Sequence, residues 1–146
     1  MTGVLNVSEA AALAVHAAAL LACTKRRTLT AREVSRALRA SEAHLAKVLQ
    51  RLAAAGLVSS TRGPHGGFAL AGDPREITLL KVWEAIEGHL RPEKCLFDSP
   101  ICGGDCILGG LIGELSGTLV KHLKSTTLAD LVRAKGRKLC ALTEKL

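Results

Sequence analysis

Three of the chain's five cysteines lie within twelve residues, in the segment CLFDSPICGGDC. Cys95, Cys102 and Cys106 are separated by six and then three residues, which include glycine, proline and aspartate. Thiolates are soft ligands that suit iron–sulfur clusters and zinc, and a flexible loop can place three of them around one centre. Three ligands leave a fourth coordination position open or held by another group. The spacing alone fits a cluster, a zinc site completed by histidine or aspartate, or cysteines that bind no metal.

The other two cysteines, Cys23 and Cys140, fall in helical contexts, one apolar and one basic, and we predict that both are structural. The apolar stretch of residues 10–23 is shorter than the roughly 20 residues that a membrane-spanning helix needs. Glu9 precedes this stretch without any Lys or Arg, which argues against a signal peptide. We therefore predict a cytoplasmic protein with no membrane partner. In that reducing compartment, an odd number of cysteines with three clustered favours metal or redox chemistry over structural disulfides.

The positive charge is concentrated in one segment. The formal net charge is +7, and residues 24–62 hold nine Lys or Arg against the two acids Glu33 and Glu42. The rest of the chain carries equal numbers of both signs. Such a local excess indicates a polyanionic partner, most simply nucleic acid, although a solvated basic face gives the same composition.

The basic segment has the pattern of a helix-turn-helix. Ser8 can cap a first helix that runs to about Ala22, and Thr30-Ala-Arg-Glu33 is a capping box for a short helix that ends near Leu38. A further helix, capped by Ser41 and stopped at Gly56, has apolar residues at helical spacing. Its other face carries His44, Lys47 and Arg51, as expected of a recognition helix.

A β-hairpin follows these helices. Residues 57–61 and 68–70 have the composition of strands, and the glycines and proline between them form the turn. A helix-turn-helix followed by such a hairpin is a winged helix. Arg62 and His65 would lie at the tip of the wing, where a cation can enter a minor groove. The predicted fold class is thus mainly α: a winged helix-turn-helix DNA-binding domain with a small β-hairpin wing and a long C-terminal dimerisation helix.

The C-terminal part supplies that dimerisation helix. A helix from Thr78 to about Gly88 precedes the cysteine loop, and the segment after the loop carries one apolar stripe of Leu108, Leu111, Ile112, Leu115, Leu119 and Leu123. This stripe suits a homodimer seam, although intrachain packing explains it as well. The segment from Thr127 predicts a short last helix with a frayed basic end. We expect a DNA-binding domain at 1–88, a cluster-binding loop at 89–106, and dimerisation and C-terminal helices at 107–146.

Several segments also resemble the Rrf2 family of bacterial transcription regulators. They are GLVSSTRGPHGGFAL, ITLLKVWEAIEG, the three-cysteine loop and TTLADLV, in this order, and the resemblance covers about residues 7–132. It implies a homodimer that binds double-stranded promoter DNA. A base-reading glutamate of the family's iron–sulfur regulator aligns with Ala46, so the promoter sequence does not transfer. The DNA-binding residues that we predict are Ser41, His44, Lys47, Arg51, Arg62, Gly63, His65 and Gly66.

The resemblance also implies an iron–sulfur cluster, 2Fe-2S or 4Fe-4S, held by Cys95, Cys102 and Cys106. The interval between the last two cysteines is shorter than in known members, which leaves the cluster type open. A family histidine three residues after the third cysteine is replaced by Gly109. Other members use an acid, or an acid and a histidine, from the first helix of the partner subunit.

In this chain the aligned acidic position is Ala12, and Glu9 and His16 share its helix face. Either could serve from the partner subunit as the fourth ligand. His16 could equally be a core histidine, and Glu9 a first-turn acid that the helix dipole favours. Asp98 and Asp105, inside the loop, are weaker candidates because polar residues are common in turns.

These observations predict a homodimeric transcriptional regulator, a repressor or an activator, whose operator affinity is controlled by a cluster that senses redox conditions, nitric oxide or iron–sulfur status. The alternative is a winged-helix regulator with zinc or no metal that responds to a small molecule or a partner protein. A metal carrier that has lost DNA binding is a third hypothesis, opposed by the basic segment. We expect no enzyme, because no phosphate-cradling loop, nucleophile elbow or paired-carboxylate pocket occurs.

Overall fold

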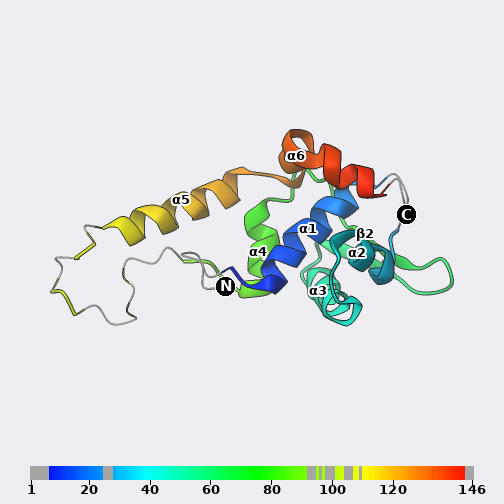
Figure 1. Cartoon of the computed structure of the whole chain (residues 1–146), viewed down its shortest axis with the longest axis horizontal. Helices are drawn as coiled ribbons and strands as arrows, with labels where there is room; N and C mark the ends of the chain where they lie inside the picture. Colours follow the sequence, from blue (N-terminus) through cyan, green and yellow to red (C-terminus); the bar gives the residue numbers. More distant parts are fainter. Residues whose placement is uncertain are drawn as a thin grey trace.

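The structure is a computed structural model, and it describes residues 7–24, 28–91, 95, 97, 101–103, 107–108 and 110–143, apart from the side chain of residue 135. Helices make up most of the described chain, and one β-hairpin projects from them (Figure 1). In chain order the elements are α1 (Glu9–Cys23), α2 (Ala31–Leu38), α3 (Glu42–Ala54), β1 (Val58–Thr61), β2 (Gly67–Leu70), α4 (Leu79–Glu87), α5 (Leu111–Ser125) and α6 (Leu128–Thr143).

Hydroxyl side chains begin the first helices at the predicted residues. The Ser8 hydroxyl accepts a hydrogen bond from the Ala11 amide at 3.0 Å. Before α2, Thr30 and Glu33 form the full capping box, with N···O distances of 2.8 and 3.2 Å. These bonds satisfy amides that have no partner inside the helix, so each helix start is encoded locally.

The core is built around α1, which lies in the middle of the body in Figure 1. Its small side chains let α3, α4 and α6 approach closely, because the distance between packed helices depends on the side chains at the contact. Leucines from the surrounding elements complete the core in place of aromatic residues. The fully buried side chains include Ala11, Ala14, Ala17, Ala19, Leu20, Leu29, Leu45, Leu49, Leu52 and Leu128.

The wing is an antiparallel pair in which Val58 faces Leu70 and Thr61 faces Gly67. Leu29, just before α2, exchanges two backbone hydrogen bonds with Phe68, at 2.8 and 2.7 Å. A Cβ at Gly67 would lie 2.7 Å from the Leu29 carbonyl oxygen, so this approach requires glycine. The predicted winged helix is therefore confirmed.

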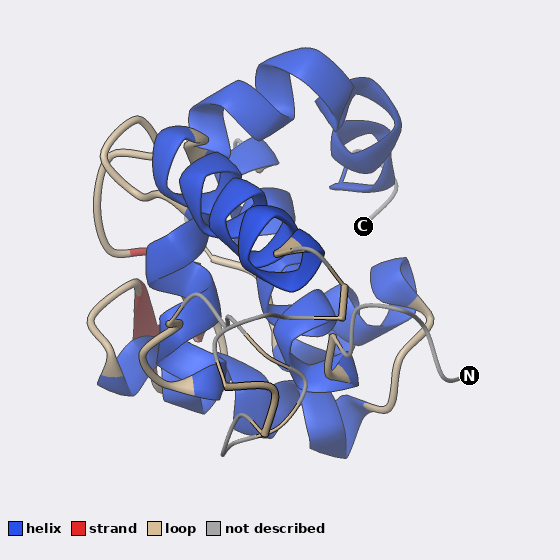
Figure 2. Ribbon diagram, turned by 90° about the vertical axis from the view of Figure 1, so that its left-hand side faces the viewer, coloured by secondary structure: helices blue, strands red, loops and turns tan. Residues whose placement is uncertain are grey.

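The helix α5 extends away from the body in Figure 1, and Figure 2 views the molecule from the side to which it extends. Its C-terminal end is anchored, because Leu123 is buried and the Leu79 amide donates to the Thr126 carbonyl at 2.9 Å. The other end of its apolar stripe is uncovered, with Leu111 48% and Leu115 44% exposed. No described helix is both long and apolar enough to cross a membrane.

One expectation for the C-terminal segment is wrong. The last helix, α6, is not short but spans 16 residues, because its half-buried leucines pack against α1. Cys23 and Cys140, which we predicted to be structural, are joined by a disulfide with a Cα–Cα distance of 5.0 Å, a pairing that was not predicted. Packing of α6 on α1 brings together two cysteines that are 117 residues apart, and no local pattern reveals this.

Candidate DNA interface and cysteine loop

The recognition helix α3 presents two contrasting faces. Leu45, Val48, Leu49 and Leu52 are buried in the core. The opposite face is exposed and includes the predicted DNA-binding residue Lys47. Ser41 caps the helix, and its exposed hydroxyl accepts a hydrogen bond from the His44 amide at 3.4 Å. The N-terminal end of α3 is thus free to enter a major groove, as in other helix-turn-helix proteins.

Two other predicted residues of α3 have partners within the chain. The His44 ring is partly exposed, and its Nδ1 lies 4.0 Å from the Glu9 carboxylate. The Arg51 guanidinium donates a hydrogen bond to the carbonyl of Ile86 in α4. Arg51 therefore ties α3 to α4 in this structure, which was not expected from its place on the polar face.

The wing tip is fully exposed. Arg62, Gly63 and His65 all face solvent, as predicted. A tight turn, in which the Gly66 amide donates to the Gly63 carbonyl at 2.9 Å, brings the two strands together. A Cβ at Gly66 would lie 2.2 Å from the Thr61 carbonyl oxygen, so this turn cannot accept another side chain without moving. The glycines therefore fix the backbone of the turn that carries Arg62.

Gln50 and Arg39 are two candidate DNA-binding residues that were not predicted from the sequence. Gln50 is exposed on α3 one turn after Lys47, and glutamine can bind adenine through two hydrogen bonds. The signal for Gln50 was its place on the polar face of the predicted helix. Arg39, exposed in the turn between α2 and α3, has a left-handed φ of 53° and adds positive charge beside the start of α3.

The cysteine loop is described only in part. Cys95 and Cys102 are free and half-buried, and the Phe97 amide donates to the Cys95 sulfur at 3.5 Å. Such N–H···S bonds are among the factors that set the potential of a cluster. Cys106, Asp98, Asp105 and Gly109 lie outside the described residues. Within the described part of the chain, no group of three His, Cys, Asp or Glu is placed to hold a metal.

Glu9 lies at a junction of three helices. The hydroxyl of its neighbour Ser8 donates a hydrogen bond to Glu87 at the end of α4, where the cysteine loop begins. The Glu9 carboxylate is exposed and faces His44 of α3. Glu9 is therefore close both to the start of the loop and to the recognition helix of its own chain.

His16 is exposed on α1, so it is not a core histidine. Its Nδ1 lies 2.7 Å from the carbonyl oxygen of Ala12 and can donate a hydrogen bond to it. Histidines that bind a metal through one ring nitrogen commonly make such a bond with the other. His16 follows Glu9 by roughly 10.5 Å along the helix axis, so the two residues occupy different places on α1.

Among the described residues, the groups with a resolved pKa shift belong neither to the predicted DNA interface nor to the cysteine loop. Hydrogen bonds from the Arg75 side chain and amide hold the pKa of the Asp73 carboxyl below its ordinary value. Hydrogen bonds from the Thr127 hydroxyl and amide lower the pKa of Asp130 at the start of α6. Both shifts stabilise local structure, and neither marks a catalytic group.

The family model that matches this chain is Rrf2, described as an iron-dependent transcriptional regulator, and it matches residues 7–134. The chain belongs to the Rrf2 family. An HTH-type transcriptional regulator of Aquifex aeolicus is 30% identical over 136 residues, which are 90% of this chain and 94% of that protein. IscR of Escherichia coli is 36% identical over 93 residues, which are 63% of this chain and 57% of IscR.

Solved structures of the Rrf2 family share the fold. CymR, the global cysteine regulator of B. subtilis, superposes with a TM-score of 0.74 at 26% identity, covering 88% of this chain and 97% of CymR. IscR of T. potens gives a TM-score of 0.70 at 27% identity, covering 89% of this chain and 88% of the IscR chain. The chain is therefore a winged-helix transcriptional regulator and not an enzyme.

Proposed function

We propose that this Rrf2 regulator is a cytoplasmic homodimer that binds promoter DNA through α3 and the wing, and that an iron–sulfur cluster held by Cys95, Cys102 and Cys106 controls its operator affinity. The observation that carries the proposal is the position of the three-cysteine segment. In the sequence it lies between a winged helix whose predicted DNA-facing side is exposed and a helix whose apolar stripe is uncovered at its N-terminal end.

The DNA contact is supported by charge and shape together. Lys47 and Arg62 are exposed on the two elements that winged-helix proteins insert into grooves, and both belong to the sequence segment 24–62 that holds the chain's excess positive charge. Gln50 offers a group for reading a base, and the wing glycines allow close approach to the DNA backbone.

The homodimer is supported by α5. Its outward stripe of Leu111 and Leu115 is continued before the helix by Ile107, which is 88% exposed. An apolar stripe of this length is suited to burial against the same stripe of a second chain, which is the arrangement of a two-fold interface. A two-fold dimer presents two recognition helices, which must fit successive major grooves about 34 Å apart.

The cluster is supported by the donor set. The described loop thiols are unpaired, and the Cys95 sulfur already accepts an amide hydrogen bond. The fourth position would be taken by His16 or Glu9 of the partner subunit, and the contact of His16 Nδ1 with the Ala12 carbonyl is of the kind that ligating histidines make. A bound cluster would supply sensitivity to oxidants and to nitric oxide.

Contacts within the chain connect Glu9, one candidate for the fourth ligand, to the recognition helix α3. Glu9 faces His44 of α3, so the partner that Glu9 takes determines the charge beside His44. A change in the order of the loop would also shift the end of α4, which Ser8 contacts through Glu87. Either effect would change how α3 is presented to DNA.

A second candidate function keeps the DNA binding and changes the signal. In this alternative the loop binds zinc or no metal, and the regulator responds to a small molecule or a partner protein. It is favoured by the structural likeness to CymR, a cysteine regulator by name, and by a pocket of about 520 Å³ between α1 and α6.

One preparation distinguishes the two candidates. Protein purified without oxygen is assayed for visible absorbance, iron, acid-labile sulfide and zinc. A cluster gives broad visible absorbance with iron and sulfide in equal amounts, whereas colourless protein with zinc, or without metal, supports the second candidate. A Cys95→Ala, Cys102→Ala, Cys106→Ala variant should be colourless, and a Cys23→Ser, Cys140→Ser variant should keep the colour.

A further inference from the structure

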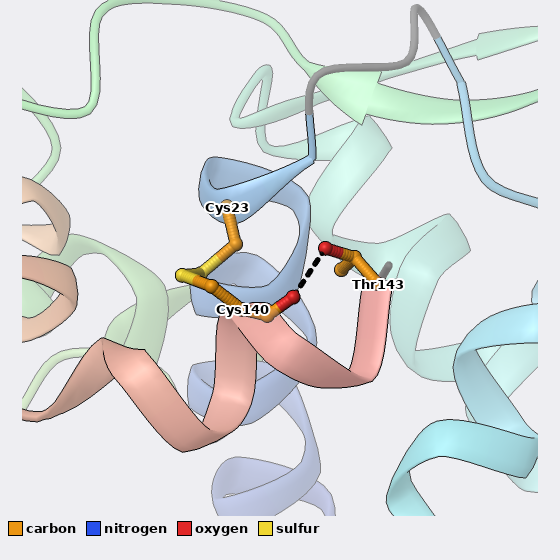
Figure 3. Close-up of a disulfide and its surroundings, with 3 residues drawn as sticks. All are labelled: Cys23, Cys140 and Thr143. Carbon is orange, nitrogen blue, oxygen red and sulfur yellow. Dashed lines mark hydrogen bonds between the residues drawn. A yellow bond between two sulfur atoms is a disulfide. The ribbon is translucent and has the colours of Figure 1, made fainter. Parts of the chain in front are cut away.

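The disulfide between Cys23 and Cys140 lies outside the cysteine loop and outside the DNA interface. Cys23 is the last residue of α1, and Cys140 lies one turn before the end of α6 (Figure 3). The Thr143 hydroxyl donates to the Cys140 carbonyl at 2.7 Å, which closes the end of α6 just beyond the bond. The bond therefore joins the ends of two helices that already pack on each other.

The beginning of α6 does not need this bond. The Leu128 amide donates to the Ile77 carbonyl at 2.9 Å, and the Ala129 amide donates to Pro74 at 3.0 Å. Thr127 and Asp130 cap the helix reciprocally, and the Leu128 side chain is completely buried. These contacts would hold the first turn of α6 whether the cysteines are oxidised or reduced.

The second half of α6 is held less firmly. Leu139 and Leu142 are only half-buried, and a pocket of about 520 Å³ lies between part of this half and Val15, His16 and Ala19 of α1. Apolar packing across such a gap is incomplete, so it contributes less than a filled interface would. The covalent bond is the strongest link between this half of α6 and α1.

We propose that Cys23 and Cys140 are a reversible redox pair that fastens and releases the second half of α6 against α1. The inference rests on the proposed function, because a DNA-binding regulator works in a reducing compartment, where disulfides are usually transient and redox-sensing. In the oxidised form, which is the form of this structure, the second half of α6 is fastened to the end of α1. In the reduced form it separates from α1 about an anchored first turn.

The oxidant that balances the chemistry is a peroxide. One cysteine attacks the O–O bond and becomes a sulfenic acid with release of water, and the second thiol displaces the hydroxyl as another water. Two thiols and one hydrogen peroxide thus give one disulfide and two waters. A dithiol reductant reverses the step by thiol–disulfide exchange and is itself oxidised to a disulfide.

Thiol trapping and hydrogen exchange on the full chain test the proposal. Protein treated with hydrogen peroxide should give a proteolytic peptide that links residues 23 and 140, and dithiothreitol should remove it. On reduction, amides of residues 137–143 should exchange about tenfold faster, while amides of residues 128–131 should be unchanged. No linked peptide after peroxide, or equal exchange of residues 137–143 in both states, would overturn the proposal.

Two variants supply the controls. Cys95→Ala, Cys102→Ala, Cys106→Ala should show the same link and the same exchange as wild type, because the loop takes no part. Cys23→Ser, Cys140→Ser should match reduced wild type under both conditions. If that variant fails to fold, wild type in its two redox states still decides the question. Neither readout uses DNA or iron, so protein that binds DNA but never forms the link contradicts only this inference.

Discussion

The two cysteine regions of this protein differ in how much of the fold each requires. The loop at residues 95–106 concentrates its thiols by sequence, and its described cysteines are unpaired and half-buried. The pair of Cys23 and Cys140 is brought together by the packing of α6 on α1, across 117 residues of chain. The first arrangement, if it binds a metal centre as we propose, would do so with little help from the core. The second exists only when the whole domain is folded, so it couples redox chemistry to stability.

Removal of the loop thiols should have the largest effect of any change. Cys95→Ala, Cys102→Ala, Cys106→Ala should abolish iron and sulfide binding, because no soft ligands remain in the loop. Its melting temperature without metal should stay within a few degrees of that of metal-free wild type, since the core does not include the loop. Metal analysis measures the iron and sulfide content, and differential scanning calorimetry measures the melting temperature. Iron retained at wild-type levels would place the metal elsewhere.

Removal of the disulfide between Cys23 and Cys140 should change stability and leave metal binding unchanged. Cys23→Ser, Cys140→Ser should lower the free energy of unfolding of the oxidised protein by about 2–5 kcal/mol, because the bond closes a long loop in the unfolded chain. The corresponding shift is about 5–15 °C in melting temperature. Iron content should not change. If the oxidised wild type and the double variant have the same melting temperature, the disulfide adds nothing to stability.

Substitution of the candidate fourth ligands tests where the loop meets α1. His16→Ala should reduce iron retention by roughly tenfold or more, and added imidazole should restore part of it. Glu9→Gln should have a smaller effect, because Glu9 already faces His44. Dialysis against a chelator, followed by iron assay, ranks the two variants. If both retain iron as wild type does, the fourth ligand is neither residue.

A change in the recognition helix should affect DNA binding without altering either cysteine region. Lys47→Ala should weaken DNA binding by roughly five- to tenfold and lower the dependence of affinity on salt by about one phosphate contact. The loss should be equal in every redox state. Fluorescence anisotropy at two salt concentrations measures it, and Lys81→Ala, an exposed lysine of α4, is the control. A loss confined to one redox state would give Lys47 a part in the switch.

The smallest effect is expected at the first turn of α6. Because the pKa of Asp130 is lowered in the fold, its carboxylate stabilises the protein above its ordinary value of 3.8, and this contribution is lost as the pH falls through the folded value. Asp130→Asn should therefore be less stable than wild type at pH 7, and the difference should disappear in strong acid. Urea unfolding at pH 7 and in acid below the folded pKa of Asp130 checks this. A difference that persists in acid would mean that charge is not the cause.

Local rules predicted much of the fold. Ser8, Thr30 and Ser41 begin their helices as expected, because a cap involves only neighbouring residues. The turn of the wing follows from its glycines, and Gly66 and Gly67 do approach other backbone closely. These features needed no knowledge of the tertiary structure.

The missed features all depend on distant contacts. The length of α6 was underestimated because its leucines are separated by basic residues, and only their contact with α1 shows that they are interior. Arg51 donates a hydrogen bond to the Ile86 carbonyl of α4, a contact that its place on the polar face of α3 did not indicate. The contact between Glu9 and His44 likewise joins helices whose relation the sequence does not express.

The most direct test of the central claim is operator affinity with and without the cluster in one anaerobic preparation. Labelled DNA selected by the protein from genomic fragments is titrated before and after the metal is removed by chelation. We predict at least a roughly tenfold change in Kd for wild type, of the size typical for coupled sites, and none for Cys95→Ala, Cys102→Ala, Cys106→Ala. Equal affinity of iron-loaded and iron-free wild type would contradict control of DNA binding by the cysteine loop.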